Sequence, residues 1–430
     1  MRKPAIMLVI CTSAAVCGTW GCGKSDRPSS ALPTLSISPS SNPATQRIVE
    51  LLARGAVEQA LAEADALVAR QPDSAAAFDA RATVHHQLGQ LEAALADLNR
   101  AVELDPANPR LRNNRGFLRL SLQQFDEALE DLKEASRLDP RYANAHNNRG
   151  LVEIAQGRYR QAIADLDTAL QVDPDYVDAY NNRGFAYLQL GRLDRALADF
   201  NRALQLQPKY VNAYSNRGLT KQRLGDVAGA ITDFTQAMIL DPDNPKYYTH
   251  RRDAYLLLGQ IEQARDDERK IEYLLKLAEL SAAIRQSPRD PTGYVSRARH
   301  YQSQGDDMRA LNDLKRALEL APGHVPALLQ RAALYRDQKQ YAAAIADCDA
   351  ILARQPAQLA YSIRGDCRLA LQEYDEALED FRLAKRLDAA VAEAYYRKSR
   401  ELERRGEEAA AAAYVQQAEQ LEPGIKDRLR

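Results

Sequence analysis

The feature that most constrains the fold of this chain is a short motif that returns every 34 residues. The copies read Asn-Asn-Arg-Gly, with Ser in place of the first Asn in the last copy, and they lie at 113–116, 147–150, 181–184 and 215–218. The same register continues back to Ala82 and forward to Arg252. A period of this length indicates an array of small units, none of which can bury its apolar side alone. We therefore expect the units to stack and to share a continuous core.

One period reads as two helices joined by a turn. Apolar and small side chains recur at helical spacing at Tyr180, Gly184, Tyr187, Leu193, Ala196, Phe200 and Ala203. Gly191 separates the two halves and Pro208 ends the second. Gly and Pro are scarce in the whole chain, at 20 and 19 of 430 residues, and good helix formers are abundant. The pattern predicts an all-α protein built of helix–turn–helix units.

These positions resemble the signature of tetratricopeptide repeats. The small and aromatic residues of that signature correspond to Gly184, Tyr187, Ala196, Phe200, Ala203 and Pro208. The residue equivalent to Ala196 returns at Ala94, Ala128, Ala162, Ala230, Ala310, Ala344, Ala377 and Ala411. The resemblance implies a solenoid, a right-handed superhelix of about eleven units, with a degenerate first unit near 46–72.

The period is interrupted once, because the step from Arg252 to its next equivalent, Ala298, is longer than one period. The extra residues near 270–281 still read as helix, so we expect one long second helix. This predicts a first sub-array at 45–275, a long-helix joint at 276–287, a second sub-array at 288–425 and a tail at 426–430.

The first 22 residues differ in character from the repeats. A basic start at 1–4 precedes an apolar run at 5–16 that is too short to span a bilayer stably, which is typical of an export signal. The segment resembles a bacterial lipoprotein signal, in which Gly21 precedes the cut and Cys22 carries the lipid, although Thr19 and Trp20 depart from the family's pattern. We expect a membrane-anchored envelope lipoprotein with a Pro/Ser-rich linker at 23–44. Ordinary signal cleavage, giving a soluble periplasmic or secreted protein, is the alternative.

Residues 18–25 also match the G-x-x-x-x-G-K-[ST] pattern of nucleotide-binding loops. That loop needs a helix that opens at its Lys-Ser end. Here four prolines follow, at Pro28, Pro33, Pro39 and Pro43, and they favour an extended linker. A P-loop enzyme is therefore much the weaker interpretation.

A recurring arginine is followed by an aspartate 16 residues later in nine units. Arg183 and Asp199 are equidistant from Gly191, so they should face each other across antiparallel helices. We expect partly buried structural ion pairs rather than anion-binding sites. The central ones are Arg115–Asp131, Arg149–Asp165, Arg183–Asp199 and Arg217–Asp233.

The first helices of such a solenoid line its concave groove, and one stripe of them repeats polar and apolar residues. The polar row is an asparagine ladder of Asn114, Asn148, Asn182 and Asn216, and the apolar row beside it is Phe117, Leu151, Phe185 and Leu219. Amide side chains offer donors and acceptors that match an extended peptide backbone. The stripe resembles the ladder of peptide-binding repeat superhelices, although Asn is common here without a ligand. We expect alanine at Asn148 and Asn182 to weaken a bound partner without lowering stability.

The remaining features favour a binding scaffold. The formal net charge is −1, which gives no basic field for nucleic acid. No acid–base, nucleophile or metal pattern stands out, so we expect no enzyme activity, cofactor, metal or small-molecule substrate. Cys348 and Cys367 fall on helices that pack together and could form a disulfide or stay as buried thiols. We expect a scaffold with a protein or peptide partner; a structural spacer or self-assembling solenoid is the alternative.

Overall fold

The computed structural model describes Leu35 and residues 43–429, and these residues form helices without any strand. The predicted signal at 1–22, including Cys22, lies outside the described residues, as does most of the predicted linker. The chain divides into two bodies between Leu274 and Leu275. We call them the N-terminal and C-terminal bodies and describe each by itself.

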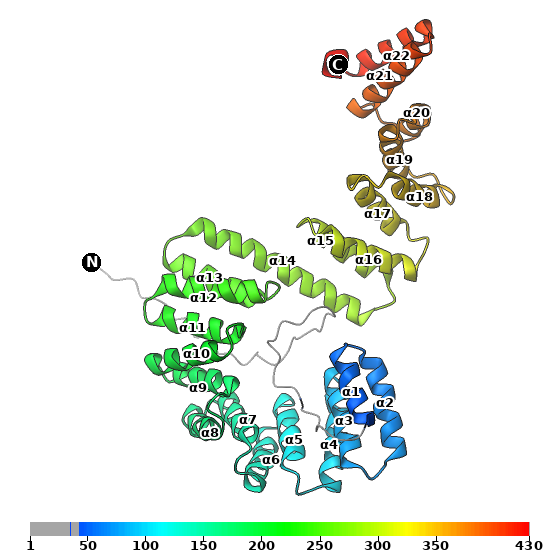
Figure 1. Ribbon diagram of the computed structural model, residues 1–430. Coiled ribbons are helices and arrows are strands. Elements are labelled where there is room, and N and C mark those ends of the chain that lie inside the picture. Colours follow the sequence, from blue (N-terminus) through cyan, green and yellow to red (C-terminus); the bar gives the residue numbers. More distant parts are fainter. Residues whose placement is uncertain (1–34, 36–42, 430) are drawn as a thin grey trace, which may run out of the picture. The chain divides into compact units, whose positions relative to one another are not determined.

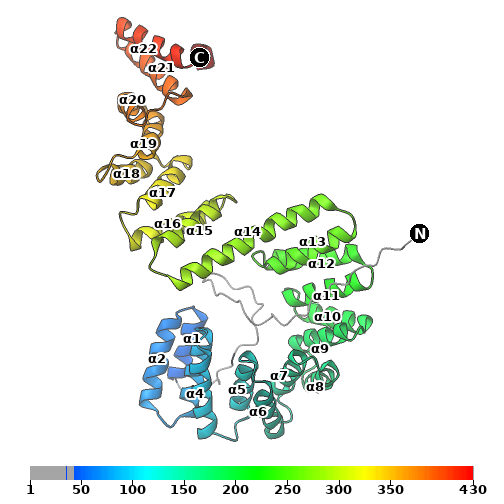
Figure 2. The ribbon, with the colours of Figure 1, turned by 180° about the vertical axis from the view of Figure 1, so that it is seen from behind.

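The N-terminal body contains seven first helices, each followed by a second helix, and the last second helix, α14, continues past the boundary of the body. Successive pairs lie side by side in chain order (Figures 1 and 2). The helices are α1 (Pro43–Ala53), α2 (Val57–Arg70), α3 (Ala75–Gln87), α4 (Leu91–Leu104), α5 (Pro109–Ser121), α6 (Phe125–Leu138), α7 (Ala143–Ala155), α8 (Tyr159–Val172), α9 (Val177–Gln189), α10 (Leu193–Leu206), α11 (Val211–Arg223), α12 (Val227–Leu240), α13 (Pro245–Leu257) and α14 (Ile261–Gln286).

The C-terminal body continues the pattern with four more pairs and one short helix. These are α15 (Pro291–Gln302), α16 (Asp307–Leu320), α17 (Val325–Asp337), α18 (Tyr341–Leu352), α19 (Gln358–Ala370), α20 (Tyr374–Leu383), α21 (Ala389–Arg404), α22 (Glu408–Leu421) and α23 (Ile425–Arg428). The described residues therefore hold eleven helix pairs, and the predicted all-α repeat solenoid is confirmed.

The two helices of a pair approach closely because a small residue on the first faces a large one on the second. A Cβ atom added to Gly184 would lie 2.8 Å from Cε1 of Phe200, which is buried completely. Ala196 and Ala203 flank Phe200 and are also buried. Burying a side chain the size of Phe200 contributes about 1.5–3 kcal/mol. These are the positions that the sequence pattern selects as the core.

The turn inside a pair uses one left-handed residue. Gly191 has φ 71°, and a glycine holds the same position in most pairs. Gln123, with φ 60°, takes this conformation without glycine's freedom, as do Lys339 and Gln372. A side chain makes a left-handed residue less favourable, so these turns store some backbone strain.

The long helix of the predicted joint is α14, which has 26 residues and contains the boundary between the bodies. The helix extends from Ile261, further back than the extra residues near 270–281 indicate, and ends at Gln286. Residues 276–287 are thus helical almost throughout.

Two ends of the array differ from the sequence expectation. The first unit is a complete helix pair, and Pro43 begins α1, where its missing N–H is tolerated. The residues predicted as a tail at 426–430 include most of α23, and Ile425, which begins that helix, is fully buried against Ala392, Tyr396 and Ala418. None of the helices that the structure describes is long and apolar enough to cross a membrane.

Candidate functional site

The asparagine ladder lies on α5, α7, α9 and α11, and each of its members is bonded to the preceding helix pair. Asn148 Nδ2 donates to Asn113 Oδ1 at 2.9 Å. Asn182 Nδ2 donates to Asn147 Oδ1 at 3.0 Å. Each of these ladder residues therefore binds the first asparagine of the motif in the preceding unit, and so connects two consecutive units.

Further bonds join these contacts into one series. Asn216 Nδ2 donates to Asn181 Oδ1 at 3.0 Å, and Asn181 Nδ2 donates to Asn182 Oδ1 within the same motif at 3.4 Å. Asn147 Nδ2 likewise donates to Asn148 Oδ1 at 3.3 Å. We call this series the amide chain; it comprises Asn216, Asn181, Asn182, Asn147, Asn148 and Asn113.

The burial of the ladder changes along its length. Asn114 and Asn148 are only 1% and 4% exposed, whereas Asn182 and Asn216 are half-buried. Removing Asn148 would leave buried amide groups without partners, which costs about 1–3 kcal/mol. This differs from the expectation that alanine there would spare stability, because the sequence does not reveal the contact between units.

Sequence reasoning missed the contacts that the inner asparagines Asn113, Asn147 and Asn181 make between units. They stand one position before the ladder, and each lies 35 residues before its ladder donor. The available signal was the doubled asparagine itself, since one amide of each pair can accept from the following unit while the other donates to the preceding one.

A buried carboxylate ends the ladder at its N-terminal side. Asp79 on α3 is 1% exposed and accepts from Asn114 Nδ2 at 3.0 Å and from Arg110 Nη1 at 2.7 Å. Burial raises the pKa of Asp79, and Arg110 and Asn114 oppose that shift. Both oxygens of this buried carboxylate accept hydrogen bonds from these donors.

A histidine takes the ladder position on the next first helix. His250 on α13 stacks on Phe234 with ring centroids 5.4 Å apart. Its Nε2 atom is buried without a hydrogen-bond partner among the described residues. Burial, aided by Lys246, lowers the pKa of His250 to about 4. The ladder thus ends in a neutral ring.

The apolar row is partly covered. Phe117 is 5% exposed, and Leu151, Phe185 and Leu219 are half-buried. Leu35, a non-helical residue of the predicted linker, is 4% exposed and belongs to the same buried cluster as Phe117. The apolar row therefore already contributes to burying an aliphatic side chain from outside the repeat helices.

The structure brings together all four predicted ion pairs. Arg183 Nη2 lies 2.7 Å from Asp199 Oδ1 and its Nε lies 2.8 Å from Oδ2, so the pair is bidentate. The carboxylates are buried while the guanidinium groups remain about one-fifth exposed. The other pairs are Arg115–Asp131, Arg149–Asp165 and Arg217–Asp233. Each ion pair joins the two helices of one unit. Because the carboxylate is buried and bonded to its arginine, it has little capacity to bind a ligand.

The cysteines lie inside the C-terminal body. Cys348 and Cys367 are free thiols, both fully buried in one apolar cluster. Burial raises the pKa of Cys348 to about 12 and that of Cys367 to about 11. The structure therefore has no disulfide between them, and both act as small apolar side chains. No group of side chains suited to a metal ion occurs in the part of the chain that the structure describes.

Several solved structures resemble parts of this chain. PilW, described as a widely conserved type IV pilus biogenesis factor, is 21% identical; the match covers 48% of this chain and 96% of PilW, with a TM-score of 0.44. YrrB, described as a TPR protein with an unusual peptide-binding site, is 20% identical, with coverages of 44% and 97% and a TM-score of 0.35. A thermophilic TPR protein of Thermus thermophilus is 24% identical, with coverages of 41% and 95% and a TM-score of 0.37. A comparison with curated proteins gives no match.

Family models match more than half of the chain. Models described as TPR repeat or tetratricopeptide repeat match 82–122, 118–152, 150–191, 177–210, 211–244, 295–358 and 329–392. The matches lie in both bodies. The chain belongs to the tetratricopeptide repeat family.

Proposed function

We propose that the chain is a non-catalytic scaffold and that the first helices of its N-terminal body bind an extended polypeptide segment. The surface of the ladder and the apolar row is uncharged, since its positions on α5, α7, α9 and α11 hold only Asn, Phe and Leu. Such a surface fits a peptide backbone and apolar side chains better than it fits a charged small molecule.

The amides of the half-buried ladder residues keep capacity for a ligand. Each Asn side chain carries two N–H donors. Asn182 and Asn216 each use one of these to bond the preceding unit. The second N–H of each is unused in the amide chain and can donate to a peptide carbonyl. The amide chain also fixes the orientation of these donors before a ligand arrives, which reduces the entropic cost of binding.

The observation that carries the proposal is the burial of Leu35. A single aliphatic side chain from a non-helical segment is held in the cluster of Phe117, Leu98 and Leu118. A partner segment that presents a similar side chain along the apolar row would be held by the same physical effect. Phe185 and Leu219 offer half-exposed positions further along that row.

Site-specific photo-crosslinking in cells tests the proposal. A photoreactive residue at Phe185 or Leu219 should yield one discrete adduct with another polypeptide. The same residue at Gln205, an exposed position on α10, should not yield it. Adducts that contain only a second copy of this chain would contradict partner binding and favour a self-assembling solenoid, and adducts of equal yield from Gln205 would contradict the site.

We also propose that Cys22 carries a lipid that anchors the chain in the bacterial envelope. The support is the sequence resemblance alone, since Cys22 lies outside the described residues. Acyl chains contribute about 0.8 kcal/mol of membrane affinity per buried CH2. Labelled palmitate should be incorporated into the intact chain and lost in Cys22→Ala, and incorporation that survives this change would overturn the anchor.

A further inference from the structure

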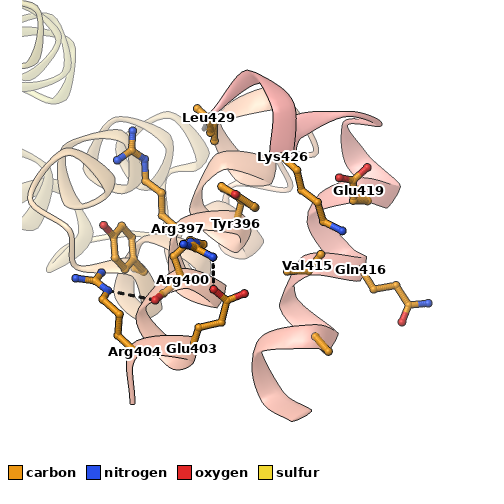
Figure 3. A pocket seen from close by; sticks show the side chains of 12 residues that line it. Tyr396, Arg397, Arg400, Glu403, Arg404, Val415, Gln416, Glu419, Lys426 and Leu429 are labelled. Carbon is orange, nitrogen blue, oxygen red and sulfur yellow. Dashed lines mark hydrogen bonds and ion pairs between the residues drawn. The ribbon is translucent and has the colours of Figure 1, made fainter. Parts of the chain in front are cut away.

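A pocket lies at the last helix pair, and none of its lining residues belongs to the ladder or to the apolar row. It is an open cavity of about 920 Å³ lined mainly by residues of α21, α22 and α23, with Tyr374 of α20 (Figure 3). All of its lining residues belong to the C-terminal body. The pocket is therefore independent of the surface proposed above.

Four cations line this pocket. Arg397, Arg400 and Arg404 follow one another along α21 at spacings of three and four residues, which places them on one side of the helix. Lys426 extends from α23 on the other side of the pocket (Figure 3). Only two carboxylates line the same space, those of Glu403 and Glu419, so the pocket carries a net positive charge.

Two of the four cations have no carboxylate partner among the described residues. Arg400 pairs with Glu403, and Arg397 Nε donates to Glu393 Oε1 at 2.7 Å. In contrast, Arg404 Nε donates only to the backbone oxygen of Arg400, at 3.2 Å, and Lys426 makes no ion pair within the described part of the chain. Their charges are available to a ligand.

The two lining carboxylates are themselves engaged. Glu403 accepts from Arg400, and Glu419 Oε2 accepts from the backbone N–H of Gly424 at 2.9 Å. Apolar and aromatic side chains complete the wall, namely Tyr374, Tyr396, Val415 and Leu429. A fitting ligand would present carboxylates to the cations and an apolar group to this wall.

We propose that this pocket binds an acidic segment of a partner polypeptide. Guanidinium groups match carboxylates in shape and charge, and the apolar wall can hold a neighbouring aliphatic side chain. Glu403 and Glu419 lie in the lining of the pocket itself. These acidic groups would repel the dense charge of a nucleic acid or polyphosphate, but a peptide with separated single charges can avoid them.

The test measures binding of a labelled peptide of alternating Glu and Leu to the full chain by fluorescence anisotropy at about 150 mM salt, where exposed charges are screened beyond about 8 Å. We expect saturable binding, and none for a peptide in which Gln replaces Glu. The double variant Arg404→Gln with Lys426→Gln should bind the acidic peptide at least tenfold more weakly. The matched pair Arg289→Gln with Lys315→Gln removes the same charge from exposed positions of the same body and should change affinity less than twofold.

A gain of affinity provides a readout that misfolding cannot imitate. Glu403→Gln frees Arg400 from its partner and should tighten binding of the acidic peptide about threefold. Equal losses in the two double variants, or no gain in Glu403→Gln, would overturn the proposal. Displacement of the peptide by inorganic pyrophosphate at equal concentration would show a phosphate site instead and would also overturn it.

Discussion

At the scale of single residues, the same arginine meets two aspartates in very different surroundings. Arg183 bonds Asp199, whose side chain is 8% exposed, and Asp167 on the preceding pair, whose side chain is 44% exposed. The first contact joins the two helices of one unit, and the second joins two units. A comparison of the two separates the contribution of a buried partner from that of an exposed one.

We expect Asp199→Asn to lower the free energy of unfolding by about 3 kcal/mol, because Arg183 loses its buried partner and keeps only the more exposed Asp167. Asp167→Asn should cost less than about 1 kcal/mol. Asparagine is already found at the positions equivalent to Asp167 in other units. Asn99 accepts a hydrogen bond from Arg115 there, and Asn201 accepts one from Arg217. Urea unfolding measures both variants, and equal losses would show that burial does not set the strength of the pair.

The histidine that ends the ladder predicts a dependence of stability on pH. The pKa of His250 is about 4 in the folded chain, below its ordinary value of 6.5. The unfolded chain therefore binds this proton more readily, so His250 destabilises the fold as the pH falls from about 6.5 towards 4. The loss should approach about 3 kcal/mol at pH 4.

His250→Asn, which restores the residue found in the ladder, should remove this part of the loss. The measurement compares urea unfolding of the natural chain and of the variant at pH 7 and pH 4, so that shared carboxylate titrations cancel. An identical pH response in the two proteins would contradict the shifted pKa.

At the scale of elements, the turns inside the helix pairs give the clearest case of local strain. Gln123 is left-handed, with φ 60°, where Gly191 and its equivalents supply glycine. We expect Gln123→Gly to raise the free energy of unfolding by about 0.5–1 kcal/mol, because the relief of backbone strain exceeds the flexibility that glycine adds to the unfolded chain. Gln124, with φ −85°, is the adjacent control, and Gln124→Gly should not stabilise. An equal gain in both, measured by urea unfolding, would show that the left-handed conformation of Gln123 is not the source of the gain.

The sequence predicts contacts within one unit better than contacts between units. The Arg183–Asp199 pair follows from equal distances to Gly191, because a hairpin of helices fixes which positions face each other. The contact of Asn148 with Asn113 does not follow, because it depends on how one unit is rotated on the next. The helical state of α23 was also missed, since four residues give no periodic pattern.

At the scale of the whole molecule, Leu35 links the predicted linker to the surface that we propose for a partner. A residue tethered to the surface that it occupies competes at a high effective concentration with any free peptide. The linker would therefore act as an internal competitor for the apolar row.

We expect a labelled peptide of residues 30–41 to bind the Leu35→Asp chain at least tenfold more tightly than the natural chain, because the substitution vacates the cluster of Phe117. Leu32→Asp changes the same kind of residue in the same linker and should leave the affinity unchanged. Fluorescence anisotropy gives both values. Equal affinities for all three chains would contradict competition by Leu35.

The amide chain has a direction, since every bond that crosses between units runs from the nitrogen of the later unit to the oxygen of the earlier one. Any unit that carries the doubled asparagine can follow any other, because its donor meets the same kind of acceptor. A whole unit can thus be gained or lost between α5 and α11 without leaving a buried amide unmatched, whereas a single-residue insertion within a unit would shift the donor off its acceptor. The bonds that stabilise this surface therefore allow its length, and with it the length of segment it can hold, to change in whole repeats.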